Sequence, residues 1–223
     1  MIFYFHLGYP KTGTKFLQQR IFNNIDEISY LGKDFNDNFE NILVDIISLS
    51  EHEFKLKKEK LIERINIELI KTNKRKIIIS DERLITSLFL NKKEKIQGND
   101  IKVTISRIYE IFSTIGKVKF LIVIRKQTEI LESFLYQISL GSFLQFKLNK
   151  KKIISSFQGF KSDQSFIIEN FMYAKIYNHL LSLTKSSKLI IFEDLKYAPK
   201  DYFLELSDFL DLEKRIYFLP QES

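Results

Sequence analysis

The feature that most constrains this chain lies almost at its start, where an apolar stretch runs into a glycine-containing loop. Residues 2–7 predict a strand, and residues 8–16 read Gly-Tyr-Pro-Lys-Thr-Gly-Thr-Lys-Phe. A helix is predicted to begin at Thr14, directly after this loop. Backbone N–H groups converge on a ligand in such a strand–loop–helix arrangement, at the positive end of the helix dipole. The sequence therefore predicts an anion site here, and phosphate is the natural ligand.

The small and polar residues of the loop suit this role. Gly8 and Gly13 permit backbone angles and a close ligand approach that a side chain would block. Lys11 adds a mobile positive charge within the loop, and Thr12 and Thr14 add hydroxyl groups. Alternatively, Thr14 serves only the start of the helix.

The loop differs from a Walker A loop at one informative position. A Walker loop ends in Gly-Lys-Ser/Thr, whose lysine reaches the terminal phosphates and whose hydroxyl binds magnesium. Here Gly8 and Gly13 have the Walker separation, but Gly13 is followed by Thr14, Lys15 and Phe16. An aromatic ring therefore follows the lysine in place of a hydroxyl, and the principal lysine lies in the middle of the loop. This pattern favours phosphate binding without the usual magnesium ligand.

A second motif follows an apolar stretch in the middle of the chain. Residues 119–124 predict a buried strand that leads into Arg125, and Ser133 lies eight positions later on a predicted helix. The loop and this pair together resemble sulfotransferases that use 3′-phosphoadenosine 5′-phosphosulfate (PAPS), specifically a bacterial, carbohydrate-type enzyme. In that family the phosphosulfate loop typically reads Pro-Lys-Ser/Thr-Gly-Thr. An arginine after a strand and a serine eight residues later hold the 3′-phosphate.

The resemblance implies contacts to the transferring end of the nucleotide. Lys11 would stabilise the sulfuryl group and the bridge oxygen, while Lys15 would either add a second charge or face solvent. Thr12, Gly13 and Thr14 would cradle the 5′-phosphate through backbone N–H and hydroxyl groups.

The resemblance also implies contacts to the other end of the nucleotide. Phe16 occupies the position of an aromatic residue that packs on adenine, although it could equally belong to the core. Arg125 would bind the 3′-phosphate, with Ser133 adding a hydroxyl. The basic, glycine-containing element that the family commonly contributes near its C-terminus has no counterpart in residues 219–223.

The candidate general base lies at the end of a third predicted strand. Residues 76–80 are followed by Asp81, Glu82 and Arg83, and ligands of open α/β sheets bind at the carboxyl ends of strands. Carbohydrate sulfotransferases often use a glutamate as base, which makes Glu82 the first candidate and Asp81 the second. Alternatively, Asp81 caps the next helix and Glu82 pairs with Arg83. His6, within the first strand, is predicted to be a hydrogen-bonded core residue.

The succession of strands and helices predicts an α/β fold of three layers, with a mostly parallel central sheet like that of P-loop proteins. Strands as continuously apolar as residues 76–80 and 118–124 need helices on both faces. Residues 1–223 are predicted to form one domain. The other predicted strands cover residues 28–31 and 189–192, and the predicted helices cover residues 14–24, 38–49, 55–72, 84–90, 101–115, 128–140, 166–183 and 200–212.

Composition excludes several classes of function. The chain has no cysteine, which rules out disulfides and thiolate sites. No apolar run reaches the length of a membrane span, and we expect a cytoplasmic protein. No acidic or histidine cluster has metal-ligand spacing, and we expect no metal requirement. The net charge of +7 fits an anionic nucleotide, and lysines 150–152 indicate that the acceptor is also anionic.

The sequence thus predicts a PAPS-dependent sulfotransferase that moves a sulfuryl group to a hydroxyl or amine, with a saccharide as acceptor. The product nucleotide would be adenosine 3′,5′-bisphosphate (PAP). One alternative is a P-loop kinase acting on a small molecule, and another is a family member that binds nucleotide without turnover. A third is a nucleic-acid-binding module, against which the chain shows no interleaved basic and aromatic motif.

Overall fold

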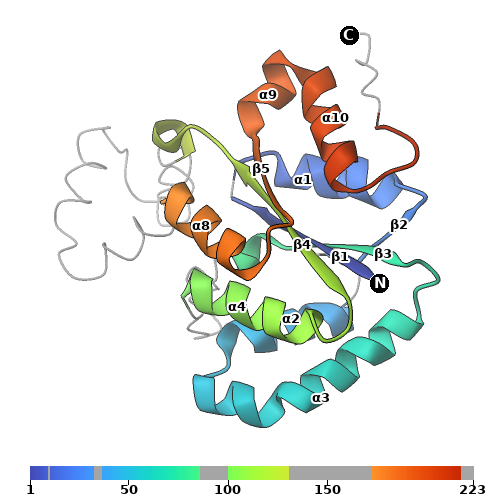
Figure 1. Ribbon diagram of the computed structural model, residues 1–223, viewed down its shortest axis with the longest axis vertical. Helices are drawn as coiled ribbons and strands as arrows, with labels where there is room; N and C mark the ends of the chain where they lie inside the picture. Colours follow the sequence, from blue (N-terminus) through green and yellow to red (C-terminus); the bar gives the residue numbers. More distant parts are fainter. Residues whose placement is uncertain (10, 33–36, 86–99, 131–171, 217–223) are drawn as a thin grey trace, which may run out of the picture.

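The structure is a computed structural model, and it describes residues 1–9, 11–32, 37–85, 100–130 and 172–216 (Figure 1). The strands in these ranges are β1 (Ile2–Gly8), β2 (Ile28–Tyr30), β3 (Lys76–Ser80), β4 (Lys117–Ile124) and β5 (Ser187–Ile191). The helices are α1 (Thr14–Phe16), the π-helix η1 (Leu17–Ile21), the 3₁₀ helices η2 (Phe22–Asn24) and η3 (Glu82–Leu84), α2 (Asp37–Ser48), α3 (Glu51–Ile70), α4 (Ile101–Phe112), α8 (Tyr173–Leu183), α9 (Phe192–Tyr197) and α10 (Pro199–Phe209).

The five described strands form one sheet in the order β2-β3-β1-β4-β5, and each neighbouring pair is parallel. This confirms the predicted α/β class and the mostly parallel sheet. β1 is the central strand, and it is buried along nearly its whole length. Its carboxyl end therefore lies between those of β3 and β4, which is where open α/β sheets bind ligands.

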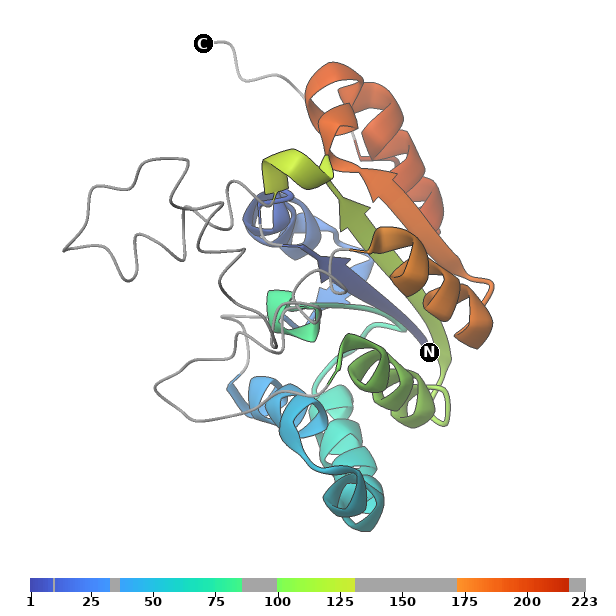
Figure 2. The same cartoon turned by 90° about the vertical axis from the view of Figure 1, so that its left-hand side faces the viewer.

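Side chains alternate between the two faces of the sheet, as the pleat requires. Phe3, Phe5 and Leu7 of β1 belong to a core that includes residues of α2, α3, α4 and α8. Tyr4 points to the opposite face, where α1, η1 and α10 complete a second core. Figures 1 and 2 show the two sets of helices on opposite sides of the sheet, which gives the predicted three layers.

Several predicted boundaries differ from those of the structure, and two of the differences have identifiable local reasons. The helix expected over residues 55–72 begins at Glu51, because Ser50 forms a capping box with Glu53. The Ser50 hydroxyl accepts a bond from the Glu53 N–H, and the Glu53 carboxylate accepts one from the Ser50 N–H at 3.0 Å. The strand expected over residues 189–192 ends one residue earlier, since Phe192 begins α9.

The other predicted helices are matched in part. The helix expected over residues 14–24 is a helical run whose winding changes from α1 through the π-helix η1 to η2. The segment predicted to be helical from residue 84 onward includes the end of η3, and residues 86–90 lie outside the described ranges. The helices predicted over residues 128–140 and 166–183 also lie partly outside them.

Candidate active site

The loop after β1 adopts a conformation that depends on glycine. Gly13 is the N-cap of α1 and has a left-handed backbone with φ of 73°. A Cβ atom at this position would lie 2.8 Å from Cε2 of Phe192, so a side chain is excluded by space as well as by φ. Lys11 also has a positive φ, of 66°, and its side chain is exposed. The loop thus turns sharply twice and leaves the Lys11 ammonium on the outside.

The threonine hydroxyls of the loop bind the loop's own backbone. Thr12 Oγ1 donates to the Tyr9 carbonyl at 2.6 Å, and Thr14 Oγ1 donates to the same carbonyl at 3.2 Å. Both threonines are buried. Their hydroxyls therefore shape the loop rather than project from it. The first N–H groups of α1 have no intrahelical carbonyl to bind, which makes them the candidate donors to an anion.

A buried polar cluster lies beneath the loop. His6 is 1% exposed, and its Nδ1 lies 2.7 Å from Oγ of Ser80 on the neighbouring strand. Gln18 Nε2 donates to the Ser80 carbonyl at 3.2 Å and to its hydroxyl at 3.1 Å. Burial lowers the pKa of His6 to about 3. The prediction of a hydrogen-bonded core histidine is confirmed.

Gly8 connects this cluster to the loop. A Cβ atom at Gly8 would collide with Oγ1 of Thr14 and would lie 2.7 Å from Cε1 of His6. The absence of a side chain at Gly8 therefore lets the start of α1 pack directly on β1. Gly8 does not have a positive φ, so the structure requires glycine here for this packing and not for the unusual backbone angle that the sequence predicted.

The structure brings the two sequence motifs together. The register of β1 and β4 pairs Gly8 with Val123, so that Arg125 follows close to the point where the loop begins. Nη1 of Arg125 donates to the Lys11 carbonyl at 3.2 Å. Residues 114 positions apart in the chain are thus in direct contact, at the carboxyl ends of two adjacent strands.

Three further side chains hold Arg125, and the motif did not predict them. Oε2 of Glu129 accepts bonds from Nη2 at 2.9 Å and from Nε at 3.3 Å. The guanidinium carbon lies 5.3 Å from the ring centroid of Phe192. The Tyr173 hydroxyl donates to the Arg125 carbonyl at 2.8 Å. Of these contacts, only Glu129 had a local signal, because it lies four residues after Arg125 on a predicted helical segment.

Tyr173 also contacts the loop. Its ring meets that of Tyr9 edge to face, with 5.0 Å between the centroids. Burial raises the pKa of Tyr173 to about 12, so its hydroxyl remains a donor to Arg125 at neutral pH. Tyr173, the first residue of α8, therefore contacts both the loop and Arg125.

The end of β3 is organised around a buried ion pair. Asp81 is fully buried, and both of its carboxylate oxygens accept bonds from Nε of Arg83 at 2.9 Å. Asp81 also caps η3 by accepting a bond from the Arg83 N–H at 2.8 Å, and Glu40 accepts from Nη2 of the same arginine at 2.8 Å. Burial lowers the pKa of Arg83, but hydrogen bonding and the charge of Asp81 outweigh this effect and raise it.

The two candidate bases therefore have different surroundings. Asp81 makes the capping contact that the alternative interpretation predicted, and its oxygens are occupied by Arg83. Glu82 is the first residue of η3 and is only partly buried. Because a base must reach the acceptor, the geometry favours Glu82 over Asp81.

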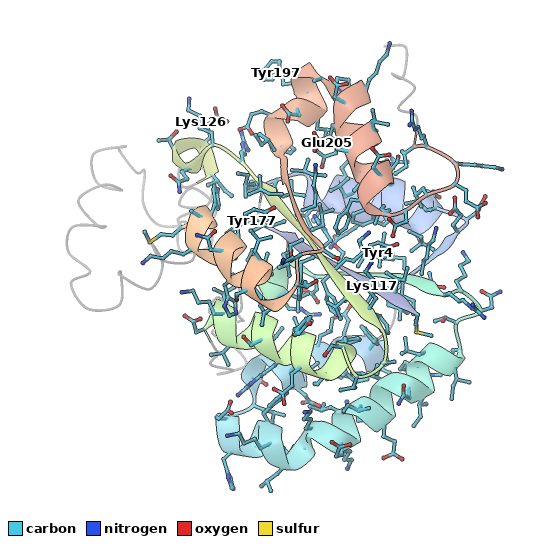
Figure 3. All side chains as sticks on the ribbon, in the orientation of Figure 1. Tyr4, Lys117, Lys126, Tyr177, Tyr197 and Glu205 are labelled. Atoms are coloured by element: carbon cyan, nitrogen blue, oxygen red, sulfur yellow. The ribbon has the colours of Figure 1, made fainter. Side chains whose placement is uncertain are left out.

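The remaining candidates have varied positions. Lys15 is exposed on the first helical turn, and Phe16 packs against the core on the α10 side of the sheet. The core interpretation of Phe16 thus has structural support. Ser133 and lysines 150–152 lie outside the described residues. Figure 3 shows Lys117 and Lys126 near opposite ends of β4, and Lys126 is exposed.

Within the described ranges, no group of three or more His, Asp or Glu side chains could hold a metal ion. The helices in these ranges include none with the length and apolar character needed to cross a membrane.

The central parallel sheet, with a glycine-dependent loop after its first strand, defines a P-loop-like α/β fold. Two solved structures share it. A sulfotransferase from Alicyclobacillus acidocaldarius has 14% sequence identity to this chain and superposes on it with a TM-score of 0.58. The match covers 97% of this chain and 86% of the sulfotransferase. A sulfotransferase domain from the curacin biosynthetic pathway is 15% identical with a TM-score of 0.50, over 99% and 75% of the two chains. No protein-family model matches the sequence, and no curated protein matches it. The chain therefore has the sulfotransferase fold.

Proposed function

We propose that this protein is a PAPS-dependent sulfotransferase. The observation that carries the proposal is the contact between Arg125 Nη1 and the Lys11 carbonyl. It unites an anion-binding loop with a strand-end arginine, as recognition of a nucleotide with phosphates at both ends requires. The fold shared with two sulfotransferase structures supports the same assignment.

The proposed reaction is an in-line displacement at sulfur. The acceptor oxygen forms a bond to sulfur while the bond from sulfur to the bridging phosphate oxygen breaks, and PAP leaves with the bonding electrons. Lys11 stabilises the charge that develops on the bridge oxygen, and N–H groups at the start of α1 bind the 5′-phosphate. Glu82 accepts the acceptor's proton. Arg125, together with Ser133, binds the 3′-phosphate.

A saccharide hydroxyl is the acceptor that we favour. A glutamate base at the end of β3 is the feature of carbohydrate sulfotransferases that this sequence resembles. Lysines 150–152 suit an anionic saccharide, because closely spaced positive charges attract a chain of acidic sugars.

Nucleotide binding is tested by thermal denaturation with PAP, ADP, or ATP plus magnesium at equal concentrations. A ligand at about a hundred times its Kd adds about 2.7 kcal/mol of stability. For a domain of this size, the expected shift in Tm is about 5–11 °C. We expect this shift with PAP and its loss in Arg125→Ala. A shift in Tm with ATP plus magnesium, and none with PAP, would support the kinase alternative.

Turnover separates an active enzyme from a nucleotide-binding protein without activity. Sulfur-labelled PAPS is incubated with a panel of neutral and acidic saccharides, and transfer of the label is measured. We expect transfer to at least one saccharide, and transfer about 10²–10³-fold slower with Lys11→Ala. Binding of PAP without transfer to any acceptor would favour the inactive alternative.

A further inference from the structure

Phe192 occupies a position between the two nucleotide-binding segments. β5 pairs with β4 so that Ile191, the last residue of β5, lies opposite Ile124, the last residue of β4. The residue after β5 is Phe192, and the residue after β4 is Arg125. The Phe192 ring lies 5.3 Å from the Arg125 guanidinium carbon. The same ring touches the loop, where it occupies the space next to Gly13 that a side chain would need.

The contacts around Arg125 come from different directions and have different chemistry. Glu129 and the Lys11 carbonyl accept hydrogen bonds from the edges of the guanidinium. Phe192 supplies an aromatic ring, on which a planar guanidinium stacks favourably. An arginine held in this way loses less side-chain entropy when it binds a phosphate.

The residue after Phe192 strengthens the same connection. Oε1 of Glu193 accepts a hydrogen bond at 3.0 Å from the backbone N–H of Lys126, the residue that follows Arg125. The end of β5 therefore holds the backbone after β4 while the Phe192 ring contacts the arginine side chain. The Phe192 ring thus fixes the Arg125 side chain relative to the loop, and Glu193 fixes the backbone after β4 relative to the end of β5.

We propose that Phe192 is a positioning residue that couples the loop to Arg125 and presents the guanidinium to the 3′-phosphate. This inference rests on the proposed function, because it assigns the 3′-phosphate to Arg125. Phe192 itself acts through Arg125 and does not take part in the chemistry. Its removal should therefore weaken recognition of the 3′-phosphate and leave the binding of a nucleotide without that group unchanged.

The test compares PAP with AMP, which differ only in the 3′-phosphate, by calorimetric titration of the whole chain. Phe192→Leu keeps an apolar side chain but removes the aromatic face. We expect about fivefold weaker PAP binding with unchanged AMP binding. Phe192→Tyr should restore PAP affinity to within about twofold of the wild type. Tyr197→Leu, at an exposed position of the same helix, is the matched control and should bind both nucleotides normally.

A double-mutant cycle separates this inference from the proposed function. In an Arg125→Ala background, Phe192→Leu should cause no further loss of PAP affinity. If Arg125→Ala keeps the preference for PAP over AMP, the assignment of the 3′-phosphate is wrong. If that preference is lost but Phe192→Leu binds PAP normally, or weakens PAP and AMP equally, the role of Phe192 is overturned. Should Phe192→Leu fail to fold, Phe192→Met is judged by the same criteria.

Discussion

The ends of β1 and β3 lie on adjacent parallel strands, yet they use charge in opposite ways. After β1, the chain makes two left-handed turns and leaves the Lys11 side chain exposed, with the partly exposed Arg125 beside it. After β3, the fully buried Asp81 is neutralised by Arg83. The end of β1 exposes the positive charge of Lys11, whereas Asp81 and Arg83 at the end of β3 neutralise each other.

The comparison shows that a polar residue at a strand end is not by itself evidence of a catalytic role. Asp81 and Glu82 are adjacent in sequence, and both follow a buried strand. Asp81 is fully buried and bonded to Arg83, whereas Glu82 is only partly buried. A fully buried carboxylate whose two oxygens already accept hydrogen bonds is poorly placed to reach the proton of an acceptor. Burial therefore separates the two candidates.

Glu82→Gln tests this distinction, and of the changes considered it should have the largest effect. Replacing a general base typically lowers kcat by about 10²–10⁴-fold, and we expect a loss in this range with Tm unchanged. The measurement is transfer from PAPS to the saccharide identified in the panel. Glu59→Gln, at an exposed position on α3, is the control for an equivalent loss of charge. Full activity in Glu82→Gln would remove Glu82 as the base.

Lys11→Ala tests the outward-facing charge at the other strand end. Loss of a group that stabilises transition-state charge costs about 10²–10³-fold in kcat, and we expect an effect of this size. Because the side chain is exposed, stability should not change. Lys57→Ala on α3 removes an exposed charge far from the site and should retain full turnover. Equal activity in the two variants would contradict the role of Lys11.

Asp81→Ala should affect stability rather than chemistry. Removing one partner of a buried ion pair costs about 3–5 kcal/mol, and we expect the low end, about 3 kcal/mol, because Glu40 still binds Arg83. The unfolding free energy is measured by urea denaturation. The affinity for PAP, measured well below the unfolding transition, should be unchanged. Normal stability combined with lost turnover would instead restore Asp81 as a candidate base.

The sequence was sufficient to predict the parallel sheet and the glycine-dependent loop after β1, because both leave local signals. Gly13 was identifiable because its backbone has a positive φ, which L side chains rarely adopt. Continuous apolar runs identified the strands, and the order of strands and helices identified the class. In these parts of the chain, local chemistry and the final fold agree.

Contacts between distant segments could not be predicted in this way. Phe192 was expected to end a strand, and nothing in its neighbourhood indicated that its ring reaches both Gly13 and Arg125. Tyr173 likewise meets Tyr9 and Arg125 only through tertiary packing. The sequence also left the role of Asp81 open, because a cap and a base can occupy the same position after a strand.

His6 gives the smallest predicted effect and concerns the polar cluster beneath the loop. Its pKa is lowered to about 3 by burial, against about 6.5 in the unfolded chain. Between these two values the unfolded state binds a proton that the folded state does not, so stability falls as pH decreases. From pH 7 to pH 5, His6 should account for about 2 kcal/mol of lost stability. Urea denaturation at both pH values, for the wild type and for His6→Gln, measures this contribution, because the other titrating groups are common to both proteins.

If the two proteins lost equal stability, the imidazole would be able to take up a proton in the folded state. The cluster would then be more open to water than its burial indicates.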